Sequence, residues 1–163
     1  KPTEIVTRHI LDSLTVLPHL HGKRILDIGT GAGLPGIPLA VASPEREFTL
    51  LDSSSKKLRF VQQTLAIITL DNVILENHRI EEYKPQERFD TIICRAFSDL
   101  HELYRHATRL IAEDGRILAM KGVYPMTEIE CLEDKDVVDE VIPLKVPGMD
   151  AERHLVCMHP AAH

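Results

Sequence analysis

Short apolar runs alternate with longer segments whose apolar residues recur every three or four positions, a pattern typical of strands followed by helices. The apolar runs predict strands over 24–28, 47–51, 73–76, 88–94, 116–120, 141–146 and 153–158. The longer segments predict helices over 4–17, 35–42, 53–68, 100–110 and 126–132. Strand and helix alternate five times before a final hairpin, which turns at 147–150. The chain is therefore predicted to be an α/β protein, a doubly wound and mostly parallel sheet with a C-terminal antiparallel hairpin.

The first predicted strand runs directly into a turn that is rich in glycine. Gly29, Gly31, Gly33 and Gly36 follow it closely, and Pro35 is placed to open the next helix. Glycine is favoured where the backbone needs angles that a Cβ forbids and where a ligand lies against the main chain. A strand, glycine turn and helix in this order predict a site for a nucleotide-like ligand.

Two acidic residues decide which ligand this turn suits. The spacing from Gly31 to Gly36 matches the dinucleotide fingerprint, with Asp52 about 20 residues further on. Asp27 at the end of the first strand and a hairpin finish without a second domain favour S-adenosylmethionine instead. Asp52 can accept both ribose hydroxyls, and Asp27 can hold the amino group of the methionine part. Capping of the loop is the alternative role of Asp27.

Composition narrows the class of protein further. Nineteen Lys and Arg against 25 Asp and Glu give a net charge of −6 over 163 residues, which argues against a protein that coats nucleic acid nonspecifically. The three cysteines lie far apart without zinc spacing, so no metal is predicted and a reducing cytosol is expected. No apolar run approaches the roughly 18 residues of a membrane span. A soluble, cytoplasmic single domain over residues 1–163 is expected, with an N-terminal piece missing because the chain starts at Lys1.

Seven motifs in order resemble the bacterial ribosomal RNA small-subunit methyltransferase G family, also called glucose-inhibited division protein B. They cover nearly the whole chain and are residues 8–13 (RHILDS), 27–38 (DIGTGAGLPGIP), 51–53 with Lys56 and Lys57, 79–82 (RIEE), 94–97 (CRAF), 120–122 (MKG) and 152–156 (ERHLV).

The resemblance implies a class I methyltransferase fold, which is Rossmann-like, and methyl transfer from S-adenosylmethionine to N7 of a guanine in small-subunit (16S) ribosomal RNA. It implies cofactor contacts at Gly29, Leu34, Ile80, Glu81 and Arg95, to which the glycine turn adds Gly31. Family members usually carry an additional N-terminal helical segment that is absent here, and Ser is common at the position of Cys94.

The residues around the fourth strand fit this chemistry. N7 of guanine has a lone pair and no proton, so its methylation needs positioning and no general base. The loop after the strand reads Cys94-Arg95-Ala96-Phe97, without the Asn/Asp-Pro-Pro motif of amine methylases or the Pro-Cys nucleophile of cytosine-C5 enzymes. Cys94 is interpreted as a buried structural thiol. Phe97 can stack on a base or pack beneath the loop, while Arg95 can hold cofactor or substrate.

Basic residues at the ends of several elements are expected to surround the same pocket. Arg95 and Lys121 are the predicted catalytic pair. An RNA surface is predicted at Arg8, His9, Phe97, Lys121, Arg153 and His154, although some of these charges must also form structural salt bridges. Lys56 and Lys57 are interpreted as a solvated helix face.

Ribosomal RNA or a 30S assembly intermediate is the expected partner of a monomeric protein. The alternatives are a small-molecule methyltransferase, a noncatalytic nucleotide-binding module and a dinucleotide oxidoreductase.

Overall fold

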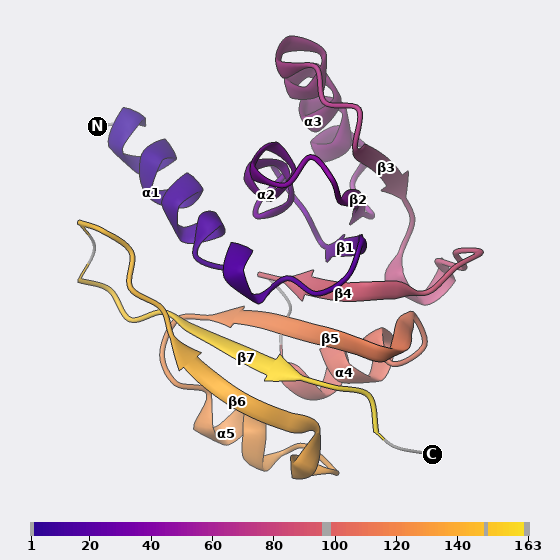
Figure 1. Ribbon diagram of the computed structural model, residues 1–163, viewed down its shortest axis with the longest axis vertical. Helices are drawn as coiled ribbons and strands as arrows, with labels where there is room; N and C mark the ends of the chain where they lie inside the picture. Colours follow the sequence, from indigo (N-terminus) through magenta and orange to yellow (C-terminus); the bar gives the residue numbers. More distant parts are fainter. Residues whose placement is uncertain (1, 96–98, 149, 162–163) are drawn as a thin grey trace.

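The computed structural model describes residues 2–95, 99–148 and 150–161 of the chain. Seven strands form a single sheet in the order β3-β2-β1-β4-β5-β7-β6 (Figure 1). The strands are β1 (Arg24–Ile28), β2 (Glu47–Asp52), β3 (Val73–Asn77), β4 (Phe89–Cys94), β5 (Ile111–Lys121), β6 (Val138–Pro143) and β7 (His154–Met158). The helices are α1 (Pro2–Leu14), α2 (Gly36–Ala42), α3 (Ser55–Ile68), α4 (Leu100–Ala107) and α5 (Met126–Glu130), with short 3-10 turns η1 (Leu17–His19), η2 (Ile80–Glu82) and η3 (Lys135–Val137).

The first five strands pair in parallel, whereas β7 is antiparallel to both β5 and β6. The carboxyl ends of β1, β2, β4 and β5 therefore lie along one edge of the sheet, and β7 begins beside the end of β5. The predicted α/β class, with a mostly parallel sheet and an antiparallel C-terminal hairpin, is confirmed. Open sheets of this kind bind ligands at the carboxyl edge.

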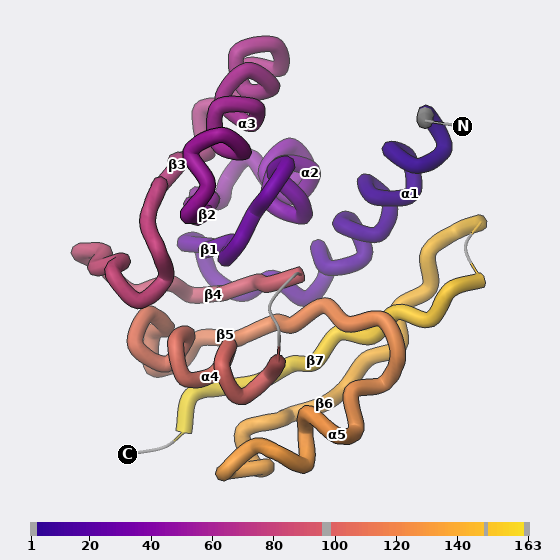
Figure 2. The backbone as a smooth tube through the Cα atoms, turned by 180° about the vertical axis from the view of Figure 1, so that it is seen from behind, coloured from indigo at the N-terminus to yellow at the C-terminus, as the bar shows by residue number. Residues whose placement is uncertain are grey.

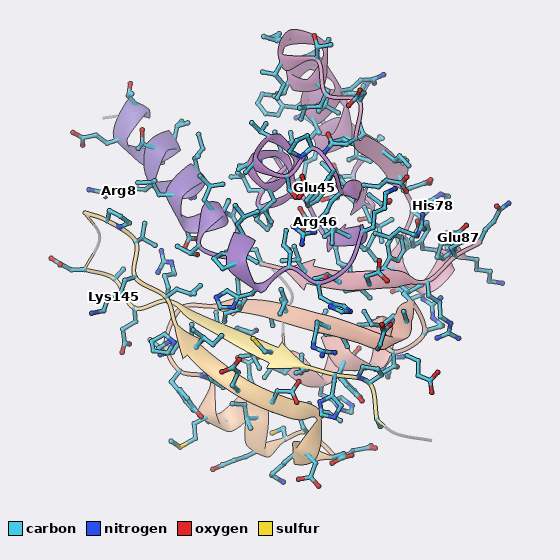
Figure 3. The ribbon with its side chains drawn as sticks, in the orientation of Figure 1. Arg8, Glu45, Arg46, His78, Glu87 and Lys145 are labelled. Atoms are coloured by element: carbon cyan, nitrogen blue, oxygen red, sulfur yellow. The ribbon has the colours of Figure 1, made fainter. Side chains whose placement is uncertain are left out.

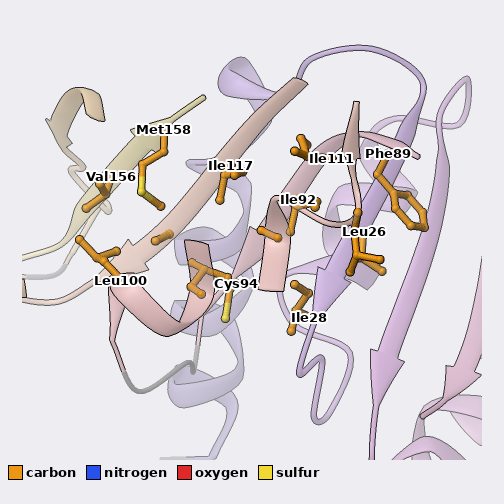
Figure 4. Packing of buried hydrophobic residues seen from close by; sticks show 14 of the residues in the cluster. Leu26, Ile28, Phe89, Ile92, Cys94, Leu100, Ile111, Ile117, Val156 and Met158 are labelled. Carbon is orange, nitrogen blue, oxygen red and sulfur yellow. The ribbon is translucent and has the colours of Figure 1, made fainter. Parts of the chain in front are cut away.

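Helices cover both faces of the sheet. On one face, α4 and α5 pack over a core that includes Leu26, Ile92, Ile117 and Val156 (Figure 4). On the other face, α2, α3 and the residues around η1 enclose a second core built on β1 and β2. The view from behind likewise separates α1, α2 and α3 from α4 and α5 (Figure 2). Because both faces are buried, β1 reads as an almost continuous apolar run.

The first helix differs from its prediction. It ends at Leu14 and not at Leu17. Val16 N donates a hydrogen bond to Ser13 O, three residues back, and the chain continues into η1. Val16 is fully buried there, whereas Ile5 and Val6, on the half of α1 that projects from the body (Figure 1), are more than half exposed. The apolar face of α1 is therefore packed only near its carboxyl end.

The largest difference lies at the start of β5, because the sequence predicts a helix up to residue 110 and a strand only from residue 116. Helix α4 ends at Ala107, and β5 begins at Ile111. Its pairing with β4 shifts, so that residues 112–115 bulge between two paired positions. A Cβ on Gly115 would lie 2.5 Å from Cγ1 of Ile111, so glycine lets the bulge fold back onto its own strand.

The hairpin strands begin at residues other than those predicted. β6 starts at Val138, inside a segment over 133–140 that is rich in acidic residues, and ends at Pro143, whereas the prediction placed it over 141–146. Asp139 and Glu140 are exposed along it, as an edge strand allows. The connection from Pro143 to His154 is longer than the four-residue turn that the sequence suggested. Leu144 N donates to Arg153 O at its base.

Candidate active site at the carboxyl edge of the sheet

The loop between β1 and α2 has the geometry that its glycines predict. Gly29, Gly31 and Gly33 all have positive φ, at 68°, 59° and 94°. A Cβ on Gly29 would meet no atom within 4 Å, so this backbone faces open space. Gly29 N and Thr30 N both donate to Leu51 O, which ties the loop to β2. The loop thus presents bare main chain at the carboxyl edge, where a ligand can lie against it.

Asp27 lies beneath this loop. Its Oδ2 accepts hydrogen bonds from Thr30 Oγ1 (2.8 Å) and Gly36 N (3.0 Å), so the carboxyl group caps the loop and the start of α2. The side chain is 1% exposed, and its Oδ1 has no hydrogen-bond partner among the described residues. Burial raises the pKa of Asp27 to about 7, against the opposing effects of Thr30, Gly36 and Arg95.

The orphaned oxygen of Asp27 fits the ammonium group of S-adenosylmethionine. A buried carboxylate oxygen without a hydrogen-bond partner is costly, and a bound cation would relieve that cost. The structure thus supports the loop-capping role directly, and the amino-group contact stays a prediction.

Asp52 stands at the end of β2 and faces the loop from its other side. Its Oδ2 accepts from Gly31 N and its Oδ1 from Ser54 N, each at 2.8 Å. Each carboxylate oxygen has two lone pairs, so both can still accept a hydroxyl proton. The geometry thus leaves room for the predicted contact with a ribose diol.

Two hollows surround the glycine loop and share Gly29. The first, of about 240 Å³, brings together Gly29, Asp52, Ile80 and Glu81. The second, of about 590 Å³, is lined by Gly29, Gly31, Leu34 and Arg95, together with Lys56, Lys57 and Phe60. All the predicted cofactor residues except the buried Asp27 therefore line one or the other of these two hollows, and their contacts with the cofactor stay predictions.

Sequence reasoning missed some of this lining. Lys56 and Lys57, interpreted as a solvated face, stand on the first turn of α3 beside the second hollow, and Phe60 follows one turn later. Their position just after the strand that ends at Asp52 is the signal that could have found them, because loops after parallel strands meet at the carboxyl edge. His78 and Arg79 line the first hollow in the same way, and Figure 3 shows His78 on the β3 side of the molecule.

The predicted basic ring divides between two faces of the sheet edge. On the side of α1, Arg95 Nη1 lies 3.4 Å from His9 Nδ1, and Arg153 Nε lies 3.5 Å from Asp12 Oδ1. Arg8 is exposed on α1 (Figure 3). The structural salt bridges that the sequence implied therefore exist at Arg153.

On the side of α4 and α5, Lys121 Nζ lies 2.8 Å from Glu128 Oε1. His154, which is paired with Lys121 across β5 and β7, has its Nδ1 at 2.7 Å from Gly122 O. Phe97, the remaining predicted RNA contact, lies outside the described residues. Cys94 is buried in the core beneath α4, as its interpretation as a structural thiol requires.

Within residues 2–95, 99–148 and 150–161, no group of three or more His, Cys, Asp or Glu side chains is arranged to hold a metal ion. None of the helices in that part of the chain is long and apolar enough to cross a membrane.

Comparison with known proteins gives the same fold and a specific family. The family model described as rRNA small subunit methyltransferase G matches residues 1–156. The Ribosomal RNA small subunit methyltransferase G of Chromobacterium violaceum is 49% identical over 94% of this chain and 74% of its own length. The protein of the same name from Idiomarina loihiensis is 45% identical over 95% of this chain and 75% of its own length.

A solved structure supports the fold independently of close sequence similarity. The Pyrococcus abyssi tRNA (uracil-54, C5)-methyltransferase, in complex with S-adenosyl-L-homocysteine, superposes with a TM-score of 0.67. It is 21% identical, covering 90% of this chain and 36% of its own, so it shows the fold alone.

These findings confirm the resemblance inferred from the seven motifs, and with it the methyltransferase class. The chain belongs to the rRNA small subunit methyltransferase G family.

Proposed function

We propose that this protein transfers a methyl group from S-adenosylmethionine to N7 of a guanine in small-subunit (16S) ribosomal RNA. The observation that carries the proposal is the convergence of three cations at one edge of the sheet. Arg95 follows β4, Lys121 ends β5 and Arg153 precedes β7, and each has a side-chain partner. An acidic protein needs such a local basic surface to hold RNA.

The residues of the loop region would hold the cofactor. Asp52 would accept the ribose hydroxyls, Asp27 would face the amino group, and the bare backbone at Gly29 would let the ligand approach closely. When bound, S-adenosylmethionine supplies an electrophilic methyl group on a positively charged sulfur. The chain's own task is then to exclude water and to fix the base.

Guanine N7 suits this arrangement because its lone pair lies in the plane of the base and carries no proton. The chain therefore has to orient the base, and it needs no side chain that removes a proton. We infer that Arg95 and Lys121, which lie on opposite sides of the edge, would contact the O6/N7 edge of guanine or a flanking phosphate. We assign them the catalytic role of orienting the base, with Arg8, His9, Arg153 and His154 as further RNA contacts.

We infer that the substrate is ribosomal RNA or a 30S assembly intermediate, met in the cytoplasm by a monomer that works as one methyltransferase domain. Cosedimentation with 30S particles and light scattering of the free protein test the partner and the oligomeric state.

Methyl transfer tests the proposal. The protein is incubated with S-adenosylmethionine carrying a labelled methyl group and with small-subunit RNA from cells that lack this enzyme. Label is expected in the RNA, and Arg95→Ala is expected to reduce transfer at least tenfold. Wild-type protein that labels small molecules but no RNA would overturn the proposal, and an Arg95→Ala protein with full transfer and full cofactor affinity would overturn the role of Arg95.

A further inference from the structure

Three exposed apolar side chains follow β5 beside Lys121. Val123, Tyr124 and Met126 are 67%, 49% and 61% exposed. We call these three residues, together with His154, the β5 ledge. A tyrosine ring that is half exposed beside two other exposed apolar side chains offers stacking surface, and such patches mark binding sites more often than isolated exposed residues do.

The β5 ledge is held by hydrogen bonds on both sides. Met126 N donates to Tyr124 O at 3.0 Å, and Ile129 N donates to Pro125 O at 3.0 Å as α5 begins. Pro125 itself is buried. The exposed ring of Tyr124 is therefore displayed on backbone that is already ordered, so a ligand would bind it at a low entropic cost.

Tyr124 and His154 form a single aromatic unit. Their ring centroids lie 5.7 Å apart, and the ring planes meet at 84°, an edge-to-face arrangement. His154 Nδ1 lies 2.7 Å from Gly122 O, and a carbonyl oxygen can only accept, so Nδ1 carries a proton. In the neutral ring Nε2 is then an acceptor, which adds one polar group to an otherwise apolar surface.

The position of this unit relates it to the predicted RNA site. His154 pairs with Lys121 across β5 and β7, so both side chains lie on the face covered by α4 and α5. Arg95 and Arg153 lie on the opposite side of the same edge. An RNA strand whose phosphates contact these arginines can therefore place a base on the β5 ledge, on the other side of the sheet edge.

We propose that Tyr124 and His154 form a stacking subsite for an unpaired nucleobase of the RNA substrate. Aromatic rings that receive splayed bases, next to cations that hold the backbone, are a general means of binding single-stranded RNA. The proposal rests on the proposed function, because it takes the substrate to be RNA. It extends that function by adding Tyr124 to the RNA contacts and by assigning a stacking role to Tyr124 and His154.

Direct binding of RNA, with no methyl transfer required, tests this subsite. The affinity for deproteinised small-subunit RNA from cells lacking the enzyme is measured by filter binding for wild type and for Tyr124→Ala, Tyr124→Leu and Tyr124→Phe. The control is Ile67→Ala, which removes an 82% exposed apolar side chain from α3. Binding of S-adenosylhomocysteine, measured by calorimetry, reports whether each variant keeps its cofactor site.

Tyr124→Ala and Tyr124→Leu are expected to weaken RNA binding roughly tenfold, which corresponds to about 1.4 kcal/mol of stacking. Tyr124→Phe and Ile67→Ala are expected to bind RNA as wild type does, and all four variants should bind the cofactor product normally. Wild-type affinity in Tyr124→Ala or Tyr124→Leu would overturn the subsite while methyl transfer to RNA still upheld the proposed function. Wild-type protein that neither binds nor methylates RNA would overturn both.

Discussion

The ammonium group of Lys121 lies 2.8 Å from Oε1 of Glu128, and the same oxygen accepts a hydrogen bond of 3.1 Å from Leu100 N. One carboxylate on α5 therefore joins the end of β5 to the first turn of α4. These two elements flank the edge where the substrate is expected, so Glu128 fixes the position of a predicted catalytic residue. No pattern in the sequence singles out Glu128.

Replacing Glu128 should destabilise this corner. Glu128→Ala removes both the ion pair and the acceptor for Leu100 N, and it should lower the free energy of unfolding by about 1–2 kcal/mol. Glu128→Gln keeps a neutral acceptor and should cost less. Urea unfolding measures both values, and Glu130→Ala, at an exposed position of the same helix, is the control. Equal stability of Glu128→Ala and Glu130→Ala would contradict the bridging role.

The buried Asp27 should make stability fall as pH rises. Its pKa is raised from 3.8 to about 7 in the folded protein, mainly by burial, so between these values the folded state binds the proton that the unfolded state has released. This contribution to stability is complete below pH 4 and is lost as pH rises through 7, by about 4 kcal/mol in total. Urea unfolding of wild type and Asp27→Asn from pH 4 to pH 8 measures this contribution. The same pH dependence of the free energy of unfolding in both proteins would contradict the role of Asp27.

Cofactor affinity should follow the opposite trend. If the ammonium group of the cofactor lies against Oδ1 of Asp27, it binds to the ionised carboxylate, so affinity should rise with pH up to about 7. The expected loss below that pH is up to about tenfold per unit. Calorimetric titration with S-adenosylhomocysteine measures the affinity. An equally steep pH dependence in Asp27→Asn would assign the effect to another group.

Replacing Gly29 in the loop and Gly36 at the start of α2 by alanine should have different effects. Gly29→Ala meets no protein atom, so it should cost only about 1–2 kcal/mol of stability for its positive φ while reducing cofactor affinity more than tenfold. Gly36→Ala would place a Cβ 2.2 Å from Leu50 Cδ2, so it should destabilise the fold itself, by about 1–3 kcal/mol. Thermal unfolding and calorimetry separate the two effects. Loss of folding in Gly29→Ala with normal folding in Gly36→Ala would contradict the assignment of Gly29 to cofactor binding and of Gly36 to stability.

The α/β class and the position of the glycine loop after the first strand could be predicted from the sequence because their signals are local. Buried parallel strands such as β1 are apolar at most positions, and three glycines of the loop have the positive φ angles that glycine favours. The acidic residues at the ends of β1 and β2 could also be placed at the carboxyl edge of the sheet, because each lies at the end of a predicted parallel strand.

The remaining features depend on contacts between distant residues. The bulge before Arg116 exists because β5 has to pair with β4, and no local pattern distinguishes it from a turn. The exposure of Ile5 depends on how α1 leaves the body of the protein, and periodicity says only that the helix has an apolar face. The partners of Arg153 and Lys121 are likewise fixed by tertiary packing, which is why the sequence predicted a ring of cations but not its division between two faces.

The most direct test of the central claim is the identity of the methylated nucleoside. Small-subunit RNA from cells lacking the enzyme is methylated in vitro with S-adenosylmethionine, digested to nucleosides and analysed by mass spectrometry against synthetic methylguanosines. A single new product, 7-methylguanosine, is expected, and it should be absent when the protein is omitted. A methyl group on N1, N2 or O6 of guanine, on another base or on ribose, or no product at all, would contradict the proposed function.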